Sequence, residues 1–81
     1  MTAHQPIHVL FLCRHNAARS QMAEAILNHM GGSRFRAWSA GREPRPDGQP
    51  HPLALEALRS AGIDTTGLRS KSWDEFGGAE A

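Results

Sequence analysis

The chain has 81 residues, 40% hydrophobic and 21% charged, which is enough for one small domain only. A formal net charge of +1, with no apolar run longer than residues 9–13, argues against a nucleic-acid partner and against membrane binding or insertion. The single cysteine, Cys13, excludes an internal disulfide framework and a cysteine-only zinc site, and it indicates the reducing cytoplasm.

The first two predicted elements are a strand and a helix. Residues 7–13 are apolar at nearly every position, which is typical of a strand covered on both faces of a parallel sheet. Residues 20–30 place apolar side chains at helical spacing, and the glycine pair that follows ends this helix. The core stripe of the helix is expected at Met22, Ile26 and Met30.

The next elements repeat this order. Residues 34–40 predict a second strand, residues 42–52 a proline-rich loop, and residues 53–61 a second helix with Leu55 and Leu58 facing the sheet. Strand, helix, strand, helix predicts an α/β fold with two parallel strands joined by a right-handed crossover. We expect a single, partial domain over residues 1–81, with a flexible tail over 77–81.

The segment that joins the first strand to the first helix contains the candidate catalytic residues. Cys13 ends the strand, and Arg19 begins the helix six residues later. Inward-pointing N–H groups of such a loop, together with the positive end of the helix dipole, form a cradle for a tetrahedral oxyanion. The same field stabilises a thiolate at Cys13, aimed at the central atom of the anion. The guanidinium of Arg19 can clamp two of the anion's oxygens.

Other residues of the segment fit this interpretation. Ser20 can donate to the thiolate, and Asn16 can hold the turn through local hydrogen bonds or a left-handed backbone. The small side chains of Ala17 and Ala18 allow close approach of a ligand. The alternative is a buried, inert cysteine beside a solvated arginine, because cysteine is among the residues most often buried.

Residues 9–25, VLFLCRHNAARSQMAEA, resemble the low-molecular-weight protein tyrosine phosphatase superfamily. The superfamily motif is Cys, five residues, Arg and Ser, with Asn at the third position after Cys. Gln-Met-Ala-Glu after the serine is similar to the arsenate reductase branch, whereas the phosphatase branch commonly has Pro-Met-Ala-Glu. Residues 38–41, 61–64 and 69–76 agree as well.

The resemblance implies a phosphatase-like parallel sheet with flanking helices, of which this chain carries the first β-α-β-α half of four strands. It implies that Cys13 attacks arsenate or a phosphate ester and that Ser20 stabilises the thiolate. The oxyanion is then bound by the loop residues Arg14, His15, Asn16, Ala17, Ala18 and Arg19. Asn16, Ser39 and Lys71 are expected to support the loop, in a region that sometimes holds a potassium ion in relatives.

The chain also departs from the family pattern. It lacks counterparts of the third and fourth strands, of the late aspartate that acts as general acid, and of the cysteines that relay a disulfide to thioredoxin. An external thiol such as glutathione or mycothiol is therefore the expected reductant, and no tightly bound cofactor is expected. No metal site is expected either, because the histidines show no ligand spacing.

Three functions remain open at this stage. The first is an arsenate reductase-like enzyme with a Cys-x5-Arg loop, and the second is a phosphatase that hydrolyses phosphate monoesters. The third is a catalytically impaired oxyanion-binding or interaction module, a truncated remnant. In the family the first strand is interior, so here it should present an open apolar edge, and we expect self-association that covers this edge.

Overall fold

The computed structural model describes residues 5–76, in the order β1 (Ile7–Cys13), α1 (Arg19–Gly31), β2 (Phe35–Gly41) and α2 (Pro52–Ser60). Short 3-10 helices follow α1 and lie at Trp73–Glu75. β1 and β2 pair in parallel, which confirms the predicted α/β order. The tail expected over residues 77–81 lies outside the described residues. No helix within residues 5–76 is long and apolar enough to cross a membrane.

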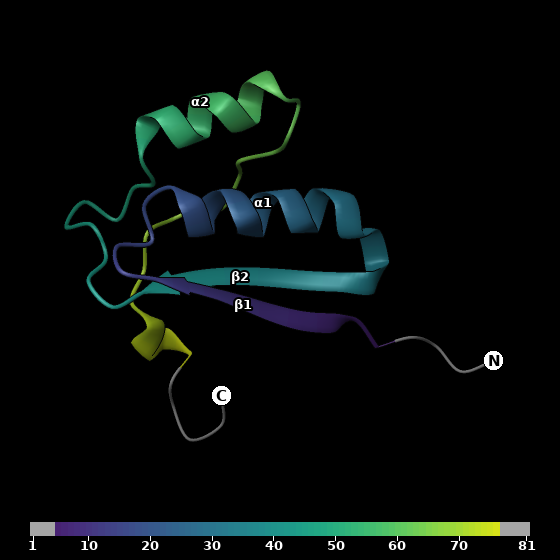
Figure 1. The fold of residues 1–81 in the computed structure, drawn as a ribbon, viewed down its shortest axis with the longest axis horizontal. Coiled ribbons are helices and arrows are strands. Elements are labelled where there is room, and N and C mark those ends of the chain that lie inside the picture. Colours follow the sequence, from purple (N-terminus) through teal and green to yellow (C-terminus); the bar gives the residue numbers. More distant parts are fainter. Residues whose placement is uncertain (1–4, 77–81) are drawn as a thin grey trace.

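The helices lie on one side of the sheet, with α1 next to the strands and α2 beyond α1 (Figure 1). Residues of β1 and β2 alternate between the two faces, so the face that bears Ser39 looks toward α1. On the opposite face Leu10 is 39% exposed and Leu12 is 55% exposed. The prediction that β1 is covered on both faces is therefore wrong for the described chain, because its helices cover only one face.

The core differs from the stripe predicted on α1. Ile26 is 40% exposed and Met30 is 76% exposed, whereas α1 buries Ser20, Gln21 and Ala25. The prediction failed because the first turn of α1 packs against the loop that precedes it, and this contact needs small and polar side chains.

α2 packs mainly against α1, with Leu58 buried, so the prediction that its leucines face the sheet is also wrong. The physical reason is the position of α1, which separates α2 from the strands (Figure 1).

The two outer edges of the sheet differ in how far their backbone groups are hydrogen-bonded. At the β2 edge, the side chain of Asn28 donates to the carbonyl of Ala37 at 3.0 Å and accepts from its N–H at 2.8 Å. Farther along this edge, the N–H of Gly41 donates to the carbonyl of Lys71 at 2.9 Å. β2 is thus partly capped, whereas β1 pairs with no second strand among residues 5–76.

Candidate active site

The sulfur of Cys13 lies at the carboxyl end of β1 and is half-buried. Its Sγ accepts a hydrogen bond from the backbone N–H of Asn16 at 2.9 Å and lies 2.8 Å from Oγ of Ser20. Asn16 adopts a left-handed backbone with φ of 51°, a conformation that asparagine tolerates better than most residues. Two polar groups therefore converge on the sulfur, an arrangement that stabilises a thiolate.

Asn16 is fully buried, and both ends of its side-chain amide are bonded. Nδ2 donates to Oγ of Ser20 at 2.7 Å. Oδ1 accepts from Nε2 of Gln21 at 2.9 Å and from the backbone N–H of Lys71 at 3.0 Å. Because Ser20 accepts from Asn16, its own proton is free to point at Cys13. The structure thus brings together Cys13, Asn16 and Ser20, which the sequence analysis placed in one loop.

The start of α1 has no side-chain cap. Its N-cap residue is Ala18, and its first turn contains no acidic residue. The backbone N–H groups of Ala17 and Ala18 donate to no acceptor among residues 5–76. Unpaired N–H groups at the positive end of a helix form a site that favours an anion.

A hollow of about 370 Å³ opens beside the sulfur. It is lined by Phe11, Leu12, Cys13, Arg14, Arg19, Ser20 and Ala23. Within residues 5–76, Arg19 makes no ion pair, so its guanidinium has no carboxylate to compete with an incoming anion.

Glu43 contacts the side chains of Arg14 and His15, the two loop residues that follow Cys13. Nε of Arg14 lies 3.4 Å from the Glu43 carboxylate, and Nδ1 of His15 lies 3.0 Å from the Glu43 carbonyl oxygen.

Neighbouring segments hold the loop of residues 13–20 in place. The N–H of Glu43 donates to the Arg14 carbonyl at 2.7 Å, the N–H of His51 to the Ala17 carbonyl at 2.7 Å, and the hydroxyl of Ser70 to the His15 carbonyl at 2.9 Å. A Cβ atom on Gly41 would come within 2.8 Å of the Asn16 nitrogen. Sequence reasoning assigned no role to Ser70 or Gly41, and it used Gln21 only as a marker of the branch.

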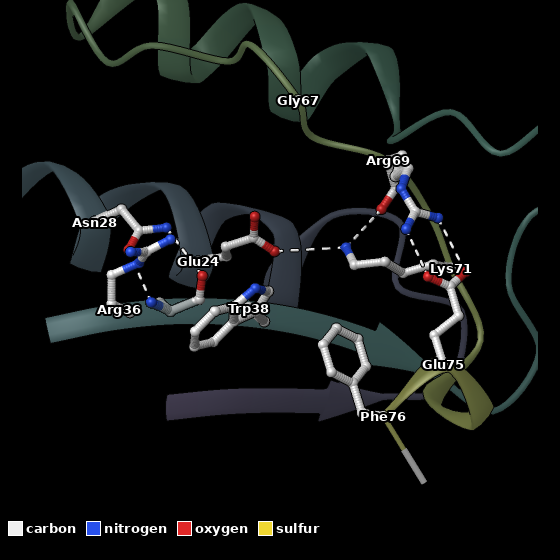
Figure 2. Close-up of a pocket in the computed structure, with 10 residues that line it drawn as sticks. Glu24, Asn28, Arg36, Trp38, Gly67, Arg69, Lys71, Glu75 and Phe76 are labelled. Atoms are coloured by element: carbon white, nitrogen blue, oxygen red, sulfur yellow. Dashed lines mark hydrogen bonds and ion pairs between the residues drawn. The ribbon is translucent and has the colours of Figure 1, made fainter. Parts of the chain in front are cut away.

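Ser39 and Lys71, predicted to support the loop, are both buried. The hydroxyl of Ser39 donates to Glu24 at 2.7 Å. Nζ of Lys71 lies 3.6 Å from the same carboxylate oxygen and donates to the Arg69 carbonyl at 3.0 Å, as Figure 2 shows. Burial lowers the pKa of Lys71 from its ordinary value, and the charge of Glu24 acts in the opposite direction. Lys71 contacts the loop through its backbone N–H, whereas Ser39 contacts α1.

The pocket in Figure 2 has a volume of about 570 Å³ and lies between Lys71 and the β2 edge. Its lining includes both aromatic and charged residues, Trp38, Phe76, Arg36 and Glu75 among them. No group of three His, Cys, Asp or Glu residues in the described part of the chain is placed to hold a metal ion.

Comparison with known proteins agrees with this geometry. Residues 8–81 match the sequence model of the low molecular weight phosphotyrosine protein phosphatases. The chain is 34% identical over 68 residues to a glutaredoxin arsenate reductase of Synechocystis, covering 84% of this chain and 50% of that protein.

Solved structures show the same relationship. The thioredoxin-dependent arsenate reductase of Corynebacterium glutamicum superposes with a TM-score of 0.78 at 41% identity, covering 88% of this chain and 35% of that one. A low molecular weight protein tyrosine phosphatase from T. tengcongensis superposes with a TM-score of 0.69 at 37% identity, covering 90% and 54%. This chain spans about half the length of the curated relatives that it matches. It therefore belongs to the low-molecular-weight phosphotyrosine protein phosphatase family, in the branch that contains the arsenate reductases.

Proposed function

We propose that this chain is an arsenate reductase-like enzyme in which Cys13 is the nucleophile. The observation that carries the proposal is the pair of contacts on its sulfur, 2.9 Å from the Asn16 nitrogen and 2.8 Å from the Ser20 oxygen, beside a hollow that Arg19 also lines. A thiolate held in this way faces a site suited to a tetrahedral oxyanion.

The proposed residue roles follow from these contacts. The oxyanion, which is arsenate, phosphate or a similar ion, is bound by the guanidinium of Arg19 and by the backbone amides of residues 14–19 other than that of Asn16, whose N–H donates to Cys13. Ser20 donates to the thiolate, and Asn16 keeps the loop in its left-handed turn. Lys71 supports Asn16 through its backbone N–H.

The proposed chemistry needs a second thiol. The Cys13 thiolate attacks As(V), a sulfur–arsenic bond forms, and an arsenate oxygen leaves as water after protonation. A second thiol then attacks the Cys13 sulfur and forms a disulfide, and the electron pair of the sulfur–arsenic bond leaves with arsenic as arsenite, As(III). Cys13 is the single cysteine of these 81 residues, so the second thiol comes from outside them. The requirement for a free thiol also supports our proposal of a cytoplasmic location.

Two other functions use the same geometry. Hydrolysis of phosphate monoesters is supported by the similarity to the T. tengcongensis phosphatase. A module that binds oxyanions with little turnover is the function that these 81 residues support by themselves, because they contain one cysteine and therefore no pair to relay a disulfide. Loss of general acid–base help alone slows a reaction by about 10²- to 10⁴-fold, so slow chemistry remains compatible with the first two functions.

The test combines two assays and one variant. Arsenate reduction is measured with glutathione, mycothiol and thioredoxin as alternative donors, next to hydrolysis of an aryl phosphate. Cys13→Ser should abolish turnover in either assay, while calorimetry still detects phosphate binding. Full turnover by Cys13→Ser would overturn the assignment of the nucleophile. Binding without turnover in the unmodified chain would favour the oxyanion-binding module.

We also propose that a second copy of the chain covers the free edge of β1. The outer edge of β2 is partly capped, whereas β1 has no second partner strand within residues 5–76, and Ile7, Leu10 and Leu12 are exposed along it. Pairing of two β1 edges would extend the sheet and satisfy the free backbone N–H and C=O groups of β1. Sedimentation should detect a dimer, and a folded monomer at tens of micromolar would contradict this proposal.

A further inference from the structure

We propose that Gln21 is a positioning residue for the Cys13 thiolate, because together with the backbone N–H of Lys71 it fixes the orientation of the Asn16 side-chain amide and thereby the direction of the Ser20 proton. The importance of this role rests on the proposed function, in which Cys13 reacts as a thiolate. The role itself follows from a chain of hydrogen bonds that runs from Gln21 through Asn16 and Ser20 to the sulfur.

The orientation of the Gln21 amide is set by its surroundings. Gln21 is fully buried in the first turn of α1. The two hydrogens of its Nε2 are shared among three acceptors, which are Oδ1 of Asn16 at 2.9 Å, the Asn16 carbonyl oxygen at 3.0 Å and the Arg69 carbonyl oxygen at 2.6 Å. The two carbonyl oxygens are acceptors that cannot donate, so the Gln21 group that faces them must be the NH₂ end.

The orientation of the Asn16 amide follows from this. One end of that amide faces two donors, Nε2 of Gln21 and the backbone N–H of Lys71, so this end must be the oxygen. The NH₂ end of Asn16 therefore faces Ser20 and donates to its Oγ at 2.7 Å. A flipped Asn16 would instead place its NH₂ group against two donors.

The orientation of Asn16 decides where the Ser20 proton points. With the Asn16 NH₂ group donating to Oγ, the hydroxyl proton is free to point at Sγ of Cys13, 2.8 Å away. With the amide flipped, the Asn16 oxygen would compete for that proton, and the sulfur would lose one of its two donors. Gln21 thus acts on the thiolate through two intermediate residues and without contact to the sulfur.

The unpaired end of the Gln21 amide supports this interpretation. Oε1 is buried and has no hydrogen-bond partner within the described part of the chain. A buried unpaired acceptor is unfavourable, and an apolar side chain of the same length would avoid this cost. The benefit of glutamine at this position therefore comes from the Nε2 contacts, two of which go to Asn16.

The experiment measures alkylation of Cys13 by iodoacetamide, which reports on a single site because the chain has one cysteine. Gln21→Met keeps the length of the side chain and removes its donors. We expect alkylation about tenfold slower near neutral pH, which corresponds to the loss of about one hydrogen bond to a charged group. The difference should shrink in strong base, where hydroxide generates the thiolate in both proteins.

The matched control is Asn28→Leu, on the same helix. It removes a side-chain amide that bonds the backbone of Ala37, away from the loop of residues 13–20. Circular dichroism should show that this variant is folded but less stable, and its alkylation rate should equal that of the unmodified chain. An unchanged rate in Gln21→Met, or an equal slowing in Asn28→Leu, would overturn the proposal.

A second measurement needs no variant. The side-chain amide signals of Gln21, Asn16 and the exposed Gln49 are followed by NMR while the thiol is titrated and its ultraviolet absorbance recorded. We expect the first two signals to move with the thiol and Gln49 to stay in place, and a static Gln21 signal would overturn the proposal. Neither measurement uses arsenate, so a chain that shows these effects without turnover would refute the proposed function and leave the role of Gln21 standing.

Discussion

Gly41 is the position at which β2 meets the loop of residues 13–20, and replacing it with alanine tests how closely the two must approach. The added Cβ would lie 2.8 Å from the Asn16 nitrogen and 2.9 Å from the Arg14 carbonyl oxygen. Both are backbone atoms, so no side-chain rotation relieves the contact. The loop would have to move by roughly half an ångström to restore ordinary packing.

The expected cost follows from this displacement. Overpacking of this kind lowers the free energy of unfolding by about 1–3 kcal/mol, out of about 4–12 kcal/mol for a domain of this length. The atom pushed away is the Asn16 nitrogen, whose N–H donates to the Cys13 sulfur at 2.9 Å. Weakening a hydrogen bond to a charged group by about 1.5 kcal/mol should slow Cys13 alkylation near neutral pH about tenfold.

The assays are urea denaturation, iodoacetamide alkylation and phosphate binding by calorimetry. Gly32→Ala is the control for a glycine replaced without a steric clash, because an added Cβ on Gly32, whose φ is 57°, meets no atom within 4 Å. That variant should lose about 1–2 kcal/mol from left-handed backbone strain and keep normal Cys13 reactivity. If Gly41→Ala matched the unmodified chain in alkylation and phosphate binding, the argument that the loop depends on this close approach would fail.

Three further predictions concern charged groups. Lys71→Met leaves the partly buried carboxylate of Glu24 without a cation and should lower the free energy of unfolding by about 3 kcal/mol or less, and adding Glu24→Gln should restore part of this loss. An additive double variant would contradict the pairing. Arg19→Lys removes the bidentate fork and should weaken phosphate binding about tenfold by calorimetry, and an unchanged affinity would show that Arg19 does not contact the anion. Hydrogen bonds from Arg69 lower the pKa of Glu75, so the stabilisation from this pair is complete above about pH 4.5 and is lost as the pH falls through the lowered pKa. In urea denaturation, the stability of Glu75→Gln should lack this acid-dependent component. A pH profile identical to that of the unmodified chain would exclude the effect.

Local patterns in the sequence were enough to predict the order of elements and the place of the reactive loop. Residues 7–13 form an apolar run of strand length, and the helix-period segment after the loop ends at a glycine pair, so local periodicity was enough to predict β1 and α1. These patterns placed Cys13 at the end of a strand and Arg19 at the start of a helix, and the structure has this arrangement.

The side chains on which the loop depends are set by packing between segments that lie far apart along the chain. Gln21 bonds the carbonyl of Arg69, Lys71 bonds Asn16, and Ser70 bonds His15, and each pair lies far apart along the chain. Periodicity reports which face of a helix or strand is apolar, and it therefore assigned the α1 core to methionine and isoleucine rather than to Ser20 and Gln21. Buried polar contacts depend on the direction of individual hydrogen bonds between distant segments, and that direction exists only once the segments have packed together.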